Sequence, residues 1–397
     1  MLSLWAALCG AAVLASAGSP AAQALARGEI DRALSLRSSG PEEARYLEAW
    51  VALARFDNDR AERLKSTLPA GSRRAAELEW HLAHRAEGNE RLERAASALC
   101  ALGDVTGRAC AEAQLRARRP AARQVEMKGA RVEIGLARGA PIPLTLGRIG
   151  GQEVGVIIDT GASESVVSAS LARKLGLALT EASFPVGVAA GAGRADARLA
   201  VAGEVTLGAL AVRNLPVLVI DLPALERANI HVILSPQQAL AGLAVTLALR
   251  DSLMSVSKRP PPAPAGAQAV TVPYVLAGLD LAVVARVGAG PPALFGIDTG
   301  MPSAYSLGPA YPGAAKAARE IALSGAGGGA VGKLLVGMPV ELGGRTFEPH
   351  AEALRSSMTG GRALGLAGLL GNGLWPQATL ILDTVGHTLT IALPADS

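Results

Sequence analysis

The pattern of hydrophobic and polar residues changes near Pro120. Between residues 25 and 119, Ala and Leu are mixed with Glu and Arg and only two prolines interrupt the chain, which is typical of helices. From Val125 onward, short runs of Val, Ile, Leu, Thr and Gly alternate with turn signals, which predicts β-strands. The clearest predicted strands are Ala130–Leu136, Ile142–Leu146, Val154–Ile158 and Val217–Ile220.

A proline-rich stretch divides the strand-rich part. Lys258–Gly266 contains four prolines, and such a segment acts as a stiff, extended linker. We therefore expect a helical region over residues 25–120, a first β-rich lobe over 125–257, a linker over 258–267 and a second lobe over 268–393. Half of the residues are hydrophobic, which supplies a core and excludes a disordered chain.

The helical region contains a faint internal repeat. Three similar octapeptides place Gly28, Asp57 and Gly88 at a turn position. Helix-turn-helix units of this kind bury their apolar faces by stacking on neighbours, and these weakly resemble tetratricopeptide-type (TPR-like) hairpins. Such a region would bind a protein partner or act as a spacer. A plain helical bundle explains the pattern equally well.

The amino terminus predicts export. Leu2–Ala17 is almost wholly apolar, about as long as a signal-peptide core and shorter than the roughly 20 residues of a membrane span. Small residues at Ala15–Ala17 and at Ala22–Ala24 give two cleavage patterns. We predict a signal peptide over residues 1–24 and a periplasmic or secreted protein without a later membrane span. A retained amphipathic anchor or a buried helix is the alternative, because no Lys or Arg precedes the run.

The cysteine and histidine content and the net charge limit the kinds of bond, metal site and partner that we expect. Export would expose Cys100 and Cys110 to an oxidising compartment, and a short Gly-bounded loop between two helices could bring them together. The alternative is two buried small hydrophobic side chains. Three Cys and five scattered His contain no metal-binding pattern, so no metal or cofactor is expected. The net charge of +4 is too small to indicate a nucleic-acid partner.

Two sequence landmarks recur in the same order in both β-rich lobes. Each lobe has an apolar strand that ends in Asp-Thr-Gly, at Val156–Gly161 and at Leu294–Gly300. A glycine-rich hairpin candidate follows, and then an apolar pair with a small residue. These later elements are Gly187–Gly193 and Ile233–Ser235 in the first lobe, and Ser324–Gly329 and Leu369–Gly371 in the second.

The repeated Asp-Thr-Gly has a physical logic. A carboxylate at the end of a buried strand, directly before a tight Gly turn, is held rigidly, and the Thr can hydrogen-bond across to the other copy. Two carboxylates brought together in this way cannot both ionise easily, so they share one proton. One Asp then acts as a general base on a bound water while the other donates a proton to the scissile carbonyl.

The duplicated motif resembles the aspartic protease family over roughly residues 125–393, as two retropepsin-like lobes fused in one chain. The resemblance implies an all-β bilobal aspartic-protease fold, here preceded by the TPR-like helical segment. It also implies a peptide or protein substrate, no cofactor, and a monomer whose lobes form an intramolecular pseudo-dimer. The site residues that it implies are the catalytic pair Asp159 and Asp298, the supporting Thr160, Gly161, Thr299 and Gly300, and the flap residues Gly191, Gly193, Gly327 and Gly328.

The sequence departs from the family pattern at several positions. Ser235 stands where the family usually has Gly, and Met301 follows the second Asp-Thr-Gly where a small residue is usual. No Tyr lies between Thr160 and Pro273, so a glycine-rich flap of the retroviral type is expected. His231 and His387 are expected to be structural or exposed.

Two functions remain open from the sequence. The first is an exported aspartic endopeptidase that hydrolyses peptide bonds with water activated between Asp159 and Asp298. The alternative, prompted by Ser235 and Met301, is an inactive protease-like protein that binds peptide and recruits a partner through its helices. Two aspartates that merely cap strands are a third explanation. A phosphate-binding loop is disfavoured because no Gly-Lys-Ser/Thr follows either glycine run.

Overall fold

The computed structural model describes most of the chain after residue 39. The described residues are 20, 36, 40–54, 57–85, 89–104, 106–118, 120–187, 194–277, 280–308, 311, 317–325, 328–335, 337–350, 352–355 and 366–395. Both predicted cleavage patterns of the signal peptide lie outside these residues, and so do the repeat glycines Gly28 and Gly88.

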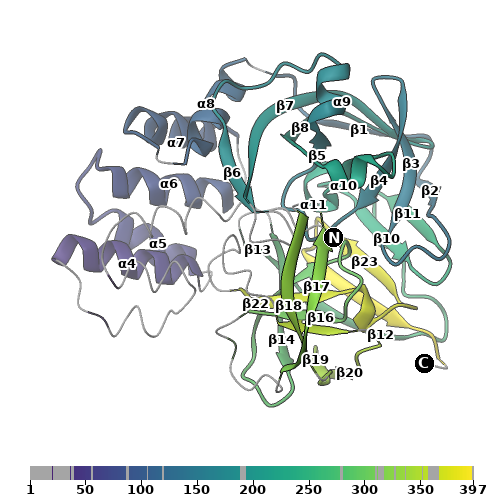
Figure 1. Ribbon diagram of the computed structural model, residues 1–397. Coiled ribbons are helices and arrows are strands. Elements are labelled where there is room, and N and C mark those ends of the chain that lie inside the picture. Colours follow the sequence, from purple (N-terminus) through teal and green to yellow (C-terminus); the bar gives the residue numbers. More distant parts are fainter. Residues whose placement is uncertain are drawn as a thin grey trace.

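Helices form the amino-terminal part: α4 (Pro41–Ala54), α5 (Asn58–Lys65), α6 (Arg73–Arg85), α7 (Asn89–Ala101) and α8 (Arg108–Ala117). Each contacts the next along the chain, and Figure 1 shows them beside the β-rich body, with α8 nearest to it. Asp57 is the N-cap of α5 and accepts a hydrogen bond from Arg60 N. Stacked helices agree with TPR-like hairpins and with a plain bundle alike, so the TPR-like nature stays a prediction.

A disulfide joins the last two helices. Cys100 in α7 is bonded to Cys110 in α8. Asp104, in the connecting loop, holds the first turn of α8, since its Oδ2 accepts a hydrogen bond from Ala109 N at 2.6 Å. The disulfide and this hydrogen bond together fix the direction in which α8 leaves α7.

The first half of the β-rich part forms an eight-stranded sheet in the order β1-β8-β5-β9-β4-β3-β7-β6, and β7 also pairs with β8, which curls the sheet into a barrel. Its strands are β1 (Gln124–Met127), β3 (Leu144–Ile149), β4 (Gln152–Ile158), β5 (Val166–Ser168), β6 (Phe184–Gly187), β7 (Arg194–Leu207), β8 (Leu210–Ile220) and β9 (Ile230–Leu234). Three short helices accompany them: α9 (Ala169–Lys174), α10 (Pro223–Glu226) and α11 (Pro236–Ala239).

The second half forms a ten-stranded sheet in the order β17-β18-β21-β16-β22-β15-β14-β19-β20, with β13 paired to β14. Its strands are β13 (Val275–Ala277), β14 (Asp280–Val287), β15 (Ala293–Asp298), β16 (Tyr305–Leu307), β17 (Ala317–Gly325), β18 (Gly328–Leu335), β19 (Val340–Leu342), β20 (Arg345–Phe347), β21 (Ala353–Arg355) and β22 (Leu366–Gly371), followed by the 3₁₀ turn η1 (Asn372–Leu374).

A third sheet of six strands joins the halves. Its order is β12-β24-β23-β10-β11-β2, with β2 (Arg131–Gly135), β10 (Ala244–Ala248), β11 (Leu253–Ser257), β12 (Gln268–Pro273), β23 (Thr379–Asp383) and β24 (Thr388–Leu393). β10 pairs antiparallel with β23, and Thr246 lies opposite Ile381. Backbone hydrogen bonds therefore connect the halves, a link that the sequence analysis did not anticipate when it assigned these strands to separate lobes.

The predicted strands are found with shifted ends. Ala130–Leu136 shortens to β2, and Val217–Ile220 is the last part of the much longer β8. The strand predicted over Ile142–Leu146 begins at Leu144, because the preceding Pro143 has no N–H to donate to a ladder. Residues 258–267 contain neither helix nor strand, as expected of the proline-rich segment.

None of the described helices combines the length and the apolar character that crossing a lipid bilayer requires.

We expect the double substitution Cys100→Ser and Cys110→Ser to lower the free energy of unfolding by about 2–3 kcal/mol, because an intact crosslink reduces the conformational freedom of the unfolded chain. Urea titrations followed by circular dichroism, with and without a thiol reductant, measure the effect. The reductant should lower the stability of the unsubstituted protein to that of the double variant and leave the variant unchanged. Equal stability of both proteins without reductant would contradict the expectation.

Candidate active site

Asp159 and Asp298 occupy equivalent positions in the two halves. Asp159 follows β4 directly, and Asp298 is the last residue of β15. Each of these strands runs parallel to the apolar strand that carries the second landmark, β4 to β9 and β15 to β22. Asp159 N donates to Leu234 O at 2.9 Å. The strand and its partner thus hold each carboxyl at the junction of the halves.

The two threonines form a reciprocal hydrogen-bonded brace. Thr160 N donates to Thr299 Oγ1 at 3.0 Å, and Thr299 N donates to Thr160 Oγ1 at 3.1 Å. Each hydroxyl also donates to the backbone of the opposite strand, Thr160 Oγ1 to Ile297 O at 2.8 Å and Thr299 Oγ1 to Ile158 O at 2.9 Å. The brace is buried, so each half fixes the backbone on which the other half's Asp stands.

Both glycines lie against the opposite carboxyl. A Cβ on Gly161 would come within 2.4 Å of Asp298 Cγ, and a Cβ on Gly300 would come within 2.7 Å of Asp159 Cγ. Any side chain at these positions would push the two aspartates apart. The Asp-Thr-Gly turns therefore need glycine for the close approach of the carboxyls.

The carboxyl pair is buried. Asp159 is 0% exposed and Asp298 is 2% exposed. Asp159 Oδ2 and Asp298 Oδ1 are buried and have no hydrogen-bond partner among the described residues. Two ionised carboxylates close together in such a place repel each other, which favours a pair that holds one proton.

Burial raises the pKa of both carboxyls, to about 7 for Asp159 and well above the ordinary value for Asp298. Asp159 Oδ1 accepts hydrogen bonds from Gly161 N at 2.8 Å and from Gly300 N at 3.2 Å, which favour its charged form. The negative charge of Asp159 raises the pKa of Asp298 further. The two backbone N–H bonds therefore favour the negative charge of the pair on the Asp159 side.

Two buried amide side chains support the turns, and sequence reasoning missed both. Gln237 Nε2 donates to Thr160 O at 3.0 Å and to Ala162 O at 2.8 Å, while Asn372 Nδ2 donates to Thr299 O at 2.6 Å. Their place directly after the second landmark of each half, within α11 and η1, could have identified them. Amides at slightly different offsets thus perform the same task in both halves.

The two departures from the family pattern lie in buried surroundings. Ser235 is fully buried, and its hydroxyl donates to Ser163 O at 3.4 Å. At the equivalent Gly371 a Cβ would come within 2.4 Å of Ser303 O, so only the first half has room for a side chain there. Met301 is 9% exposed, and its methyl group lies beside Gly371. Neither residue separates the carboxyls.

The predicted flap residues fall mostly outside the described residues. Gly191, Gly193 and Gly327 are not among them. Gly328 begins β18, which pairs antiparallel with β17 in the register Gly325 to Gly328, so a hairpin forms where the second glycine run predicts one. Within the described ranges, no group of three or more His, Cys, Asp or Glu side chains is arranged to hold a metal ion.

His231 and His387, which the sequence predicts to be structural or exposed, both make contacts away from the carboxyl pair. His231 Nδ1 lies 2.8 Å from Ser168 Oγ, which also caps α9. His387 packs its ring edge-on against Tyr274, with centroids 5.5 Å apart. Neither contact involves the carboxyl pair.

Comparison with known proteins gives a family match in the first half of the β-rich part. Residues 145–235, which include Asp159 and Ser235, match the family model described as "Aspartyl protease", and this confirms the predicted relationship to the aspartic protease family. Among solved structures, the aspartic proteinase from Irpex lacteus is similar at 13% sequence identity and a TM-score of 0.42, over 67% of this chain and 98% of that one. No curated protein matches the chain.

We expect Asp298→Asn to be more stable than the unsubstituted protein at pH 7 and equally stable below about pH 4. The raised pKa values mean that the folded protein binds protons more tightly than the unfolded chain. Stability therefore falls as the pH rises from the unfolded-state pKa to the folded-state pKa, by at most about 1.4 kcal/mol per pH unit for each group. The Asn side chain at position 298 does not titrate, so it does not contribute to this loss of stability.

Thermal unfolding at intervals between pH 3.5 and 7.5 measures the difference. Asp251→Asn is the matched control, because Asp251 is exposed at the turn between β10 and β11. A melting temperature of Asp298→Asn that follows the unsubstituted protein in parallel across this range would contradict the buried, proton-sharing pair.

Proposed function

We propose that the protein is an aspartic endopeptidase that hydrolyses peptide bonds with a water activated by Asp159 and Asp298. The observation that carries the proposal is the buried carboxyl pair at the junction of the two halves, with each Asp-Thr-Gly turn against the opposite carboxyl and with the crossed threonines behind it. A proton-sharing carboxyl pair supplies a base and an acid at the same place. The family match over residues 145–235 supports the same reaction.

The electrostatics suggest how the two roles divide. Asp159, whose Oδ1 accepts two backbone N–H bonds, is the charged partner and takes a proton from the attacking water. Asp298, which keeps the shared proton, donates it to the oxygen of the scissile carbonyl as the tetrahedral intermediate forms. The titration belongs to the pair, because the two carboxyls are coupled. Since hydrolysis needs one proton on the pair, activity should decline when rising pH removes it.

Export to the periplasm or beyond the cell is part of the proposal. The apolar amino-terminal segment motivates it, and the disulfide between Cys100 and Cys110 supports it, because such bonds persist in oxidising compartments. We further propose that the chain acts as a monomer, since both halves of the carboxyl pair come from one chain. In this proposal the outer surface of helices α4–α7 would bind a protein partner, as stacked helical hairpins commonly do.

We expect Asp159→Asn and Asp298→Asn each to lower kcat/KM by at least about 100-fold, because each removes one partner of the general acid–base pair. Incubation of the purified protein with a peptide library between pH 3 and 7, followed by mass spectrometry of the products, measures turnover. A statine-like transition-state analogue should inhibit it.

Asp251→Asn again serves as the control and should cleave at the unsubstituted rate. Full activity of Asp298→Asn would exclude the shared-proton mechanism. Binding of the statine-like peptide without any turnover by the unsubstituted protein would favour the alternative function, an inactive peptide-binding protein.

A further inference from the structure

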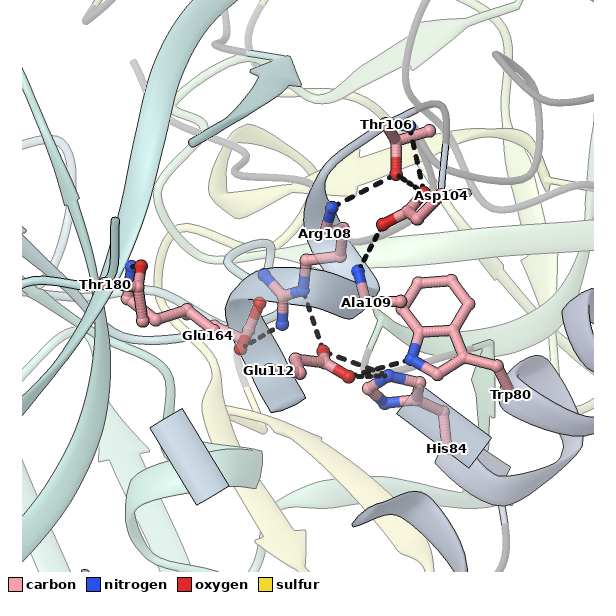
Figure 2. Close-up of polar contacts among 10 residues, drawn as sticks. Trp80, His84, Asp104, Thr106, Arg108, Ala109, Glu112, Glu164 and Thr180 are labelled. Carbon is pink, nitrogen blue, oxygen red and sulfur yellow. Dashed lines mark hydrogen bonds and ion pairs between the residues drawn. The ribbon is translucent and has the colours of Figure 1, made fainter. Parts of the chain in front are cut away.

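The helical region contacts the β-rich part through a buried charged cluster. Arg108, the first residue of α8, lies between two acids: its Nε donates to Glu112 Oε1 at 2.7 Å and its Nη2 donates to Glu164 Oε1 at 2.8 Å. Figure 2 shows the guanidinium reaching from α8 towards Glu164, with Glu112 on the other side. The three side chains are only 4–8% exposed. Their charges are removed from water and depend on one another.

The cluster is anchored inside the helical region. Glu112 Oε2 accepts hydrogen bonds from Trp80 Nε1 at 2.8 Å and from His84 Nε2 at 3.1 Å, both in α6. Burial acts to raise the pKa of Glu112, but His84 and Arg108 outweigh it, so the pKa lies well below its ordinary value. Glu112 is therefore negatively charged, and it pairs with the Arg108 guanidinium that also binds Glu164.

Helix α8 packs closely against the first half of the β-rich part. Gly107, its N-cap, has φ of 78°, and a Cβ there would come within 2.4 Å of Ser183 O. The Arg108 guanidinium also lies 4.7 Å from the centroid of the Phe184 ring, at the start of β6. Further along α8, Gln114 Oε1 accepts hydrogen bonds from Glu181 N and Ala182 N. The helix and the segment before β6 thus form a fitted interface.

Glu164 belongs to the loop that carries Asp159. The loop runs from Asp159 to Ser165, and its far side is held by the residues at and around α11: Ser165 N donates to Gln238 Oε1 at 2.7 Å, and Ser235 N donates to Ser165 Oγ at 3.1 Å. Arg108 holds the loop at Glu164, and its guanidinium comes from outside the β-rich part. A loop fixed at several points keeps its first residue in place.

The second half supports its loop differently. The residue that corresponds to Glu164 there is Ser303, and backbone groups replace the side-chain contacts: Gly371 N donates to Ala304 O at 2.9 Å, and Asn372 N donates to Met301 O at 2.9 Å. In the first half, Ser235 N instead donates to a side-chain hydroxyl. The first loop thus relies on side chains, one of which the helical region supplies.

We propose that Arg108 is a positioning residue for the Asp159 loop, so that helix α8 is a permanent component of the candidate active site. The proposal rests on the proposed peptidase function, and it gives the helical region a role within the enzyme besides partner binding. Loss of the ion pair leaves Glu164 buried without its counter-charge. The Asp159 loop then shifts or loosens, and the alignment of the two carboxyls is lost.

The test compares Arg108→Gln, Glu164→Gln and the double variant with Arg91→Gln in the full chain. Arg91 pairs with Glu62 and Glu79 inside the helical region, so its loss disturbs the helices and leaves the loop contact intact. We expect each variant of the Arg108–Glu164 pair to lower kcat by about 10–100-fold with little change in KM, because misplaced catalytic groups slow the chemical step. The double variant should be no worse than the poorer single variant, because both substitutions remove the same ion pair.

Hydrogen exchange at the amides of residues 161–165 provides a readout that does not depend on turnover. Exchange should be faster in the variants of the ion pair and unchanged in Arg91→Gln. If Arg108→Gln does not fold, Glu164→Gln carries the test, since it keeps the size of the side chain and a hydrogen-bond acceptor. If the unsubstituted protein cleaves nothing, the proposed function fails, and exchange alone decides the positioning role. Kinetics and exchange in the ion-pair variants equal to those of Arg91→Gln would overturn the inference.

Discussion

The structure depends on one constraint: two acids on separate halves must share a proton in a buried place. The crossed hydrogen bonds between Thr160 and Thr299 meet this constraint, because each half supplies donors and acceptors to the backbone of the other. Gly161 and Gly300 are required by the same closeness. If the halves separated far enough to admit water, both carboxyls would lose the burial that raises their pKa values.

The two halves are pseudo-symmetric around the Asp residues, but they differ in the contacts that hold the loop after each Asp. Both use a strand ending in Asp, a parallel apolar strand and an amide side chain that holds the carbonyl after the Asp. The second half completes its loop with backbone hydrogen bonds, and Gly371 allows the close approach that they need. The first half has Ser235 at that position and a buried ion pair to α8 instead.

Much of the site could be predicted because its signals are local. The Asp-Thr-Gly turns, their order and the later apolar pairs all follow from short segments whose residue types permit few conformations. Other features escaped prediction because they join distant segments. The positions of Gln237 and Asn372 after the second landmark could mark them as candidates, but the sequence does not show that each amide faces a carbonyl far away in the chain. Strand ends shifted for a similar reason, since β8 continues as long as β7 offers it partners.

The sequence by itself determined the change from helix to strand near Pro120, the duplicated motif and the need for glycine after each Asp-Thr. These follow from local conformational preference and from hydrophobic patterning, which act within a few residues. Only the tertiary structure decided that β10 pairs with β23 of the other half, and that Arg108 lies buried against Glu164. The physical reason is that each strand and each charged side chain has many possible partners, and burial and geometry in the folded chain select one of them. The sequence does not show which charged side chains are buried as a pair.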